Sequence, residues 1–239
     1  TNAKHCIVGD ERADVLAPEL AGLPFGQGHG SCFWMKDTVD RKAPGWAIDA
    51  NQAMQGHSDQ DLPETQGILA GDVALYIFTS GTTGLPKAAT YKQQRLVAAA
   101  NLLGSLTLRP KPGDRLYLCL PIYHITGLGP GLCGFIASGG TVCLRRTFSA
   151  SKFWSEVQAW QTNSFVYVGE LCRYLVTQAP SDAEKNNPLQ KMVGNGLRPD
   201  VWDEFKSRFD VNRICEIYGS SEGNVTFLNL LNKDRTIGT

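Results

Sequence analysis

Residues 76–87 read Tyr-Ile-Phe-Thr-Ser-Gly-Thr-Thr-Gly-Leu-Pro-Lys and carry the most informative pattern in the chain. An apolar, β-branched run over Val73–Thr79 predicts a strand, and the strand delivers a loop of hydroxyl and glycine residues. Glycines let the backbone turn with positive φ, and successive amide N–H groups with a terminal lysine bind anions. The loop is not a Walker A loop, because Pro86 precedes Lys87 and Ala88 follows it. The sequence therefore predicts a polyphosphate site of another type, formed by Thr79, Ser80, Gly81, Thr82, Thr83, Gly84 and Lys87.

Strand-like and helix-like segments alternate from Asp72 onward. The predicted strands are Val73–Thr79, Arg115–Leu120, Thr141–Leu144, Phe165–Val168, Lys191–Val193 and Arg213–Tyr218. The predicted helices are Lys92–Leu106, Thr126–Ser138, Ser151–Gln161 and one near Pro199–Phe209. Alternation of this kind is typical of an α/β fold with largely parallel sheets.

Composition narrows the function classes. The chain has 239 residues, 42% of them hydrophobic and 19% charged, with 23 basic and 23 acidic side chains. A zero net charge gives no support for a nucleic-acid partner. No run approaches 18 apolar residues, so we expect no transmembrane segment. The seven cysteines are scattered without a C-x-x-C pair, which favours reduced, buried thiols in a cytosolic protein over a metal or redox site.

A second motif lies far downstream, at residues 216–224, which read Glu-Ile-Tyr-Gly-Ser-Ser-Glu-Gly-Asn. A strand ends there in a glycine turn that carries an aromatic ring, hydroxyls and a carboxylate. Alone this signal is weak, because an exposed glutamate is usually only solvated. A carboxylate oxygen nevertheless suits Mg²⁺, which typically takes one or two carboxylates together with substrate phosphates.

Together the two motifs resemble those of the adenylate-forming superfamily of acyl-CoA synthetases, luciferases and peptide-synthetase adenylation domains. The resemblance implies that Tyr218 lies against adenine, that Ser221 meets the α-phosphate and that Glu222 binds Mg²⁺. Gly219 and Ser220 belong to the same nucleotide motif. Members of the superfamily usually have threonine at the position of Ser221. Serine keeps the hydroxyl, so we expect the activity to be altered and not lost.

Two further strings resemble a narrower group, the fatty-acid transport protein and very-long-chain acyl-CoA synthetase family. They are Gly-Asn-Gly-Leu-Arg at 194–198 and Tyr-Val-Gly-Glu-Leu-Cys-Arg-Tyr-Leu at 167–175. The first takes the place of the adenine-contacting stretch of other members, which implies adenine contacts for Gly194, Asn195, Gly196 and Leu197. The resemblance runs from about residue 74 to residue 224, and residues 1–70 match loosely.

Other residues carry a functional and a structural interpretation. A lone histidine beside an apolar run is more often structural, but the resemblance implies that His124 lies near the reacting carboxylate. The aromatic face of Phe153, Trp154 and Trp160 is most simply core. Glu170 and Arg173 stand at helical spacing and are interpreted as a structural ion pair.

The resemblance implies a ligase that activates a fatty acid with ATP to acyl-AMP and then passes the acyl group to coenzyme A. The expected catalytic residues are Thr79, His124, Ser221 and Glu222, and the expected cofactors are ATP or AMP, Mg²⁺ and coenzyme A as co-substrate. Two alternatives stay open: adenylation of an aryl or amino acid, and a non-catalytic module that binds fatty acid or nucleotide for transport.

The resemblance also implies a domain organisation. Residues 1–239 correspond to a partial N-terminal AMP-binding domain, with a loosely matching lobe and connection over 1–70 and a nucleotide-binding core over 71–239. Family members continue into a C-terminal domain with a catalytic lysine, so we expect this chain alone to be severely impaired. The expected location is cytoplasmic, with peripheral membrane association of the full-length protein left open.

Overall fold

The computed structural model describes residues 3–24, 31–37, 40–79, 84–223 and 225–238. The chain divides into two compact units, Thr1–Gly67 and Ile68–Thr239. The loop residues Ser80, Gly81, Thr82 and Thr83 lie outside the described residues.

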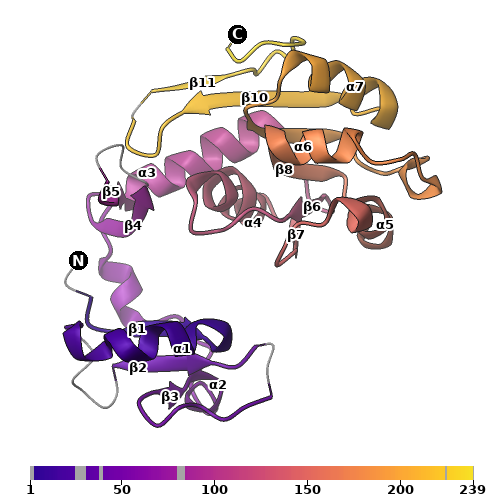
Figure 1. Cartoon of the computed structure of the whole chain (residues 1–239). Coiled ribbons are helices and arrows are strands. Elements are labelled where there is room, and N and C mark those ends of the chain that lie inside the picture. Colours follow the sequence, from indigo (N-terminus) through magenta and orange to yellow (C-terminus); the bar gives the residue numbers. More distant parts are fainter. Residues whose placement is uncertain (1–2, 25–30, 38–39, 80–83, 224, 239) are drawn as a thin grey trace. The chain divides into compact units, whose positions relative to one another are not determined.

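The first unit is built on a small parallel sheet with strand order β1-β2-β3 (Figure 1). Its strands are β1 (Cys6–Gly9), β2 (Cys32–Met35) and β3 (Ile48–Asp49), and its α-helices are α1 (Ala13–Leu16) and α2 (Ala50–Ala53). Short 3-10 helices cover Asp10–Arg12, Ala17–Gly22 and Pro63–Gly67. The core of this unit gathers around the fully buried Trp34.

The second unit contains a six-stranded sheet with strand order β11-β10-β9-β8-β6-β7. All neighbouring strands run parallel except β10 and β11, which pair antiparallel. The strands are β6 (Arg115–Leu118), β7 (Thr141–Leu144), β8 (Ser164–Val168), β9 (Lys191–Asn195), β10 (Arg213–Gly219) and β11 (Thr226–Leu228). The predicted α/β class with a largely parallel sheet is therefore confirmed.

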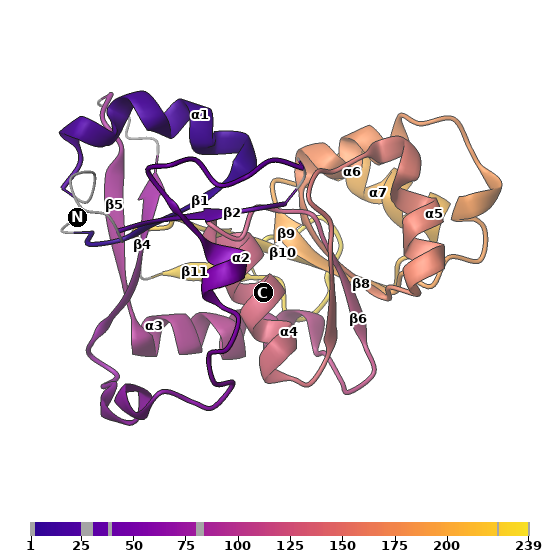
Figure 2. The same cartoon turned by 90° about the horizontal axis from the view of Figure 1, so that it is seen from below.

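Helices cover both faces of this sheet, as Figure 2 shows. On one face lie α5 (Ala150–Trp160), α6 (Gly169–Val176) and α7 (Pro199–Phe209). On the other lie α4 (Gly134–Ala137) and two π-helical segments, Ala99–Leu108 and Gly127–Cys133. A 3-10 helix covers Asp182–Glu184.

The alternation of side chains along the strands explains the two cores. In β6, Tyr117 packs with α5–α7, whereas Leu116 and Leu118 pack on the opposite face. The predicted aromatic face of Phe153, Trp154 and Trp160 belongs to the first of these cores, so its interpretation as core is confirmed.

The helix predicted over Lys92–Leu106 exists, but it ends later and is less regular than predicted. It begins as α3 (Gln93–Ala98) and continues as the π-helix Ala99–Leu108. A Cβ built on Gly104 would lie 2.6 Å from the Cα of Gly134, so glycine at both positions lets two helices approach backbone to backbone.

The predicted strand Val73–Thr79 exists as β4, but it is not a strand of the parallel sheet. It pairs antiparallel with β5 (Lys87–Lys92). The loop predicted to bind polyphosphate, or phosphate-type loop, therefore connects the two strands of a hairpin. The sequence suggested a helix straight after the loop, and the structure places β5 first. In β5 only Ala89 and Tyr91 are buried, so its apolar signal is weak.

None of the helices in the described part of the chain combines the length and the apolar character that a bilayer crossing needs.

Candidate functional site

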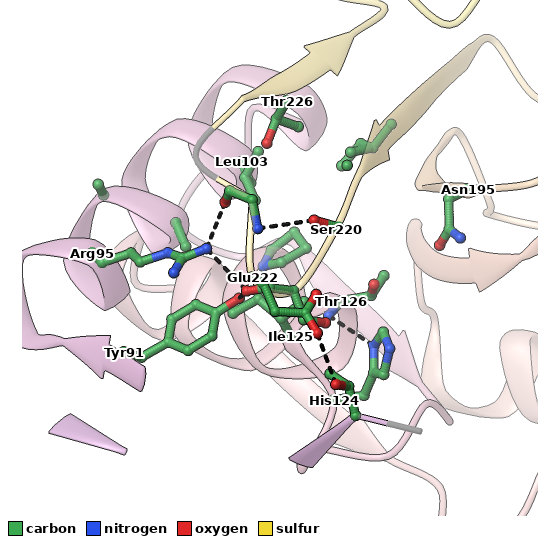
Figure 3. Close-up of a pocket in the computed structure, with 18 of the residues that line it drawn as sticks. Tyr91, Arg95, Leu103, His124, Ile125, Thr126, Asn195, Ser220, Glu222 and Thr226 are labelled. Atoms are coloured by element: carbon green, nitrogen blue, oxygen red, sulfur yellow. Dashed lines mark hydrogen bonds between the residues drawn. The ribbon is translucent and has the colours of Figure 1, made fainter. Parts of the chain in front are cut away.

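One pocket of the second unit, with a volume of about 990 Å³, brings the two sequence motifs together (Figure 3). Its walls come from the β4–β5 hairpin, the helix that starts with α3, the segment 124–130 and the turn between β10 and β11. The predicted site residues that line it are Thr79, Lys87, His124, Asn195, Gly219, Ser220, Ser221 and Glu222.

The Thr79 hydroxyl donates a hydrogen bond of 2.8 Å to Oε1 of Glu222. The two residues are 143 positions apart: Thr79 is the last residue of β4, and Glu222 lies in the turn after β10. This hydrogen bond lowers the pKa of Glu222, and the charges of Lys87 and Arg95 lower it further. The Glu222 carboxylate is therefore ionised at neutral pH and exposed to the pocket.

His124 lies at the wall of the pocket, just after β6 and a short turn. Its backbone N–H donates to the Pro121 carbonyl at 3.1 Å, and its Nδ1 accepts a hydrogen bond of 3.4 Å from the Thr126 N–H. These bonds hold the ring at the start of the following helix. Both interpretations of His124, structural and functional, are compatible with this position.

The segment from Gly194 to Leu197 is organised by a buried carboxylate on the neighbouring strand. Glu216 is 2% exposed and accepts hydrogen bonds from the Leu197 N–H, at 2.9 Å, and from the Tyr167 hydroxyl. Burial raises the pKa of Glu216, while these hydrogen bonds and one from the Gly196 backbone oppose the rise. The sequence predicts no role for Glu216, although it lies within the second motif, because nothing in the neighbouring sequence marks a glutamate as buried.

Close packing fixes the same segment from the other side. Gly196 has φ of +79°, and a Cβ on Gly169 would lie 1.8 Å from the Gly196 carbonyl oxygen. A Cβ on Gly194 would lie 2.1 Å from the Tyr167 carbonyl oxygen. Because glycine has no Cβ, the carboxyl ends of β8 and β9 and the start of α6 can pack backbone to backbone at these positions.

Several predicted residues lie outside the pocket wall. Gly194, Gly196 and Leu197 sit beside it, with only Asn195 of this segment on the wall. Tyr218 is 63% exposed, and its ring centroid lies 6.3 Å from that of Phe227. Gly84 is exposed, with φ of +100°. Ser80, Gly81, Thr82 and Thr83 cannot be placed, since they fall outside the described residues.

Two residues that line the pocket, Tyr91 and Arg95, are not predicted from the sequence. The Tyr91 hydroxyl and the Arg95 guanidinium both donate to the backbone carbonyl of Ser221, at 2.7 and 3.0 Å. Arg95 also donates to the Gly223 carbonyl at 2.6 Å. A tyrosine and an arginine four residues apart are common in any sequence, so no recognisable motif marks Tyr91 and Arg95 as site residues.

The remaining interpretations concern structural residues. Glu170 and Arg173 form the expected ion pair on α6, with a hydrogen bond of 2.9 Å between Nε and Oε2. All seven thiols are free. No group of three histidine, cysteine, aspartate or glutamate side chains with metal-binding geometry occurs among the residues that the structure describes.

A family model described as "AMP-binding enzyme" matches residues 25–239. Among curated proteins, the chain is 47% identical over 171 residues to the medium/long-chain-fatty-acid–CoA ligase FadD6 of Mycobacterium tuberculosis, covering 72% of this chain and 29% of that protein. It is 42% identical over 242 residues to human long-chain fatty acid transport protein 3, covering 98% of this chain and 35% of that protein. The chain thus spans about a third of the length of these relatives.

Solved structures show the same fold at lower identity. ATP-bound MatB from Rhodopseudomonas palustris superposes with a TM-score of 0.78 at 21% identity, covering 99% of this chain and 44% of that one. The inhibitor-bound N-terminal domain of FACL13 from Mycobacterium tuberculosis superposes with a TM-score of 0.75 at 21% identity, covering 99% and 57%. The chain therefore has the fold of the N-terminal domain region of adenylate-forming enzymes.

Proposed function

The chain belongs to the AMP-binding enzyme family, and from that premise we propose that it forms the nucleotide-binding part of a fatty-acid–CoA ligase. The observation that carries the proposal is the hydrogen bond between Thr79 and Glu222. It joins the end of the phosphate-type loop to the carboxylate of the second motif inside one pocket. The domain organisation follows the same proposal: residues 71–239 form the nucleotide-binding core, and residues 1–70 form an attached lobe.

The residues present fit a Mg²⁺ ion carried by ATP. Mg²⁺ is usually held by one or two carboxylates together with substrate phosphates, and not by an all-protein cage. Glu222 supplies one ionised, exposed carboxylate, and the Thr79 hydroxyl beside it is a second hard oxygen. When bound, the ion would neutralise charge on the phosphates, and Glu222 would hold it.

The remaining positions for ATP follow from the site. Lys87 lines the pocket and contributes a positive charge toward the phosphates. Ser221 offers its hydroxyl to the α-phosphate, with Gly219 and Ser220 in the same turn, and Gly84 with the undescribed loop residues would cradle the β- and γ-phosphates. The adenine ring would lie between Tyr218 and the segment from Gly194 to Leu197.

Adenylation needs no protein nucleophile. An oxygen of the fatty-acid carboxylate attacks the α-phosphorus of ATP, the bond to the bridging oxygen breaks, and pyrophosphate leaves. The thiol of coenzyme A then attacks the acyl carbon, and AMP leaves with the thioester formed. The chain's contribution is to orient the carboxylate near His124 and to stabilise phosphate charge with Lys87 and Ser221.

A fatty acid suits the other end of the pocket, which is apolar. Its wall there consists of aliphatic side chains from one face of the long helix and from two paired strands: Ala98, Ala99, Leu102, Leu103, Ile217 and Leu228. A hydrocarbon chain gains about 0.8 kcal/mol for each CH₂ that it buries. A polar amino-acid side chain would leave that gain unused.

Two other functions remain as alternatives. Adenylation of an aryl or amino acid would use the same nucleotide residues, and the aliphatic wall argues against it. A non-catalytic module for fatty-acid transport is suggested by the names of several relatives, which are fatty acid transport proteins. The ionised Glu222 beside Thr79 argues for retained metal and phosphate chemistry.

The complete reaction, with coenzyme A as co-substrate, is proposed for the whole protein, because the chain spans about a third of its curated relatives. We further propose a cytoplasmic location.

The experiment that tests the function is thermal unfolding with non-hydrolysable acyl-adenylate mimics that carry oleoyl, butyryl, benzoyl or alanyl groups. A ligand at 100 times its dissociation constant adds about 2.7 kcal/mol of stability, which is readily measured. The proposal predicts the largest stabilisation with the oleoyl mimic. A larger effect of the benzoyl or alanyl mimic would overturn the fatty-acid substrate, and stabilisation by none of them would overturn the nucleotide site.

A further inference from the structure

The turn from Ser220 to Gly223 has few hydrogen bonds of its own. The Gly223 N–H donates to the carbonyl oxygen and to the hydroxyl of Ser220, at 3.1 and 2.9 Å. Ser220 and Glu222 are exposed, so burial does not fix the turn. A short exposed turn with this little internal support does not by itself hold the Glu222 carboxylate in one position.

Support comes from the hairpin that also carries the phosphate-type loop. Tyr91 is the penultimate residue of β5 and is 2% exposed, and Arg95 follows on the first turn of α3. The guanidinium carbon of Arg95 lies 4.2 Å from the centre of the Tyr91 ring, which holds the two side chains together. Figure 3 shows both side chains directed at the turn.

The hydrogen bonds of this pair flank Glu222. Arg95 Nη2 donates to the carbonyls of Ser221 and Gly223, the residues on either side of Glu222, at 3.0 and 2.6 Å. The Tyr91 hydroxyl donates to the Ser221 carbonyl at 2.7 Å. Hydrogen bonds from a charged donor are about twice as strong as neutral ones. The peptide group between Ser221 and Glu222 and the carbonyl of Gly223 are therefore both fixed in direction by this pair.

We propose that Tyr91 and Arg95 are positioning residues that hold the Ser220–Gly223 turn so that the Glu222 carboxylate faces Thr79 and the metal ion of MgATP. Thr79 stands on β4, which pairs with β5, so the loop and the carboxylate are attached to the same hairpin. This inference rests on the proposed function for its ligand. The holding of the turn is a property of the chain itself and can be tested without ligand.

The first measurement is amide hydrogen exchange of the Ser220–Gly223 turn in the chain without ligand. Arg95→Met should speed exchange at Gly223 by about tenfold, and Tyr91→Phe by less, because it removes one of the three hydrogen bonds. Exchange in β8 should not change. Lys92→Met removes a nearby exposed charge without touching the turn and serves as the matched control. Unchanged exchange at Gly223 in Arg95→Met would refute the proposal.

The second measurement is the dissociation constant of ATP with and without Mg²⁺. If Arg95 acts through Glu222, Arg95→Met should reduce the enhancement by Mg²⁺ by about tenfold and change metal-free binding little. Adding Arg95→Met to Glu222→Gln should then cause no further loss, and Arg95→Lys should restore part of the enhancement.

Two outcomes distinguish the positioning role of Arg95 from direct phosphate binding and from failure of the proposed function. If Arg95→Met weakens metal-free ATP binding as much as MgATP binding, Arg95 contacts phosphate directly and the positioning role is wrong. If the unmodified chain binds no MgATP, the proposed function fails, and the hydrogen-exchange result alone decides whether Tyr91 and Arg95 hold the turn.

Discussion

Replacing Gly169 with alanine tests how tightly the segment from Gly194 to Leu197 is packed. Gly169 begins α6 directly after β8. A Cβ there would lie 1.8 Å from the carbonyl oxygen of Gly196, 2.4 Å from its carbonyl carbon and 2.9 Å from the Leu197 nitrogen. All three are backbone atoms, so no flexible side chain can move aside. Because real Cβ contacts below 3.0 Å are essentially never seen, the Gly196 carbonyl must shift by more than about 1 Å.

The expected magnitude follows from two opposing effects. Alanine in place of glycine favours a helix by roughly 0.5–1 kcal/mol. Overpacking in a well-packed site costs typically about 1–3 kcal/mol. The segment that must move is also held by Glu216 through the Leu197 N–H, so its displacement breaks a buried hydrogen bond. We therefore expect Gly169→Ala to destabilise the chain by about 2–3 kcal/mol.

The assay is denaturant unfolding, followed by measurement of ATP binding in the folded variant. Gly71→Ala is the matched control, because a Cβ at Gly71 meets nothing within 4 Å. Its stability should stay within about 0.5 kcal/mol of the unmodified chain. Equal stabilities of Gly169→Ala and Gly71→Ala, with unchanged ATP binding, would refute the packing argument.

Three further predictions concern the core, a buried carboxylate and the thiols. Phe153→Ala should cost about 3–5 kcal/mol in denaturant unfolding, because the ring is fully buried, whereas Phe227→Ala, at a 55% exposed ring, should cost much less; equal losses would contradict the assigned core. Burial raises the pKa of Glu216 above 4.5, so its contribution to stability is full below about pH 4.5 and is lost as the pH rises through the raised value. Glu216→Gln should therefore gain stability relative to the unmodified chain as the pH rises from 4.5 to 7, and a pH-independent difference would contradict this. Burial raises the pKa of Cys119 to about 12 and that of Cys215 to about 11, so neither should react with a disulfide reagent at pH 8 until the chain is unfolded; rapid labelling of either in the native chain would contradict their burial.

Strands β6 and β8 could be predicted from the sequence because they are buried on both faces. Tyr117 and Leu118, or Phe165 and Val166, are neighbours that pack into opposite cores, so each strand appears as a continuous apolar run. The pairing of β4 with β5 could not be predicted in this way. It depends on a contact across the loop, and β5 has only a weak apolar pattern.

The candidate site divides in the same manner. Thr79, Lys87, Ser221 and Glu222 stand out because glycines, hydroxyls and charges cluster in two short strings. Arg95 does not stand out, because it acts on backbone carbonyls 126 and 128 positions away and leaves no local pattern. The same holds for Glu216, whose role depends on burial by β8 and β9 and not on its neighbours in sequence.

The proposed function gives one hairpin a part in binding both the nucleotide and the fatty acid. Thr79 and Lys87 at its tip face the polar end of the pocket. The helix that follows the hairpin supplies Ala98 and Leu102 to the apolar end. If the proposed function holds, a change in how the hairpin packs alters nucleotide and acyl binding together.

The most direct test of the central claim is a crystal structure of the chain with a non-hydrolysable oleoyl-adenylate mimic. The account predicts the phosphate replacement within hydrogen-bond distance of the Ser221 hydroxyl and the adenine beside Tyr218 and the Gly194–Leu197 segment. It also predicts the acyl chain between the long helix and the β10–β11 strands, against Leu102 and Leu228. A nucleotide bound away from Ser221, or an acyl chain directed out of the pocket into solvent, would contradict it.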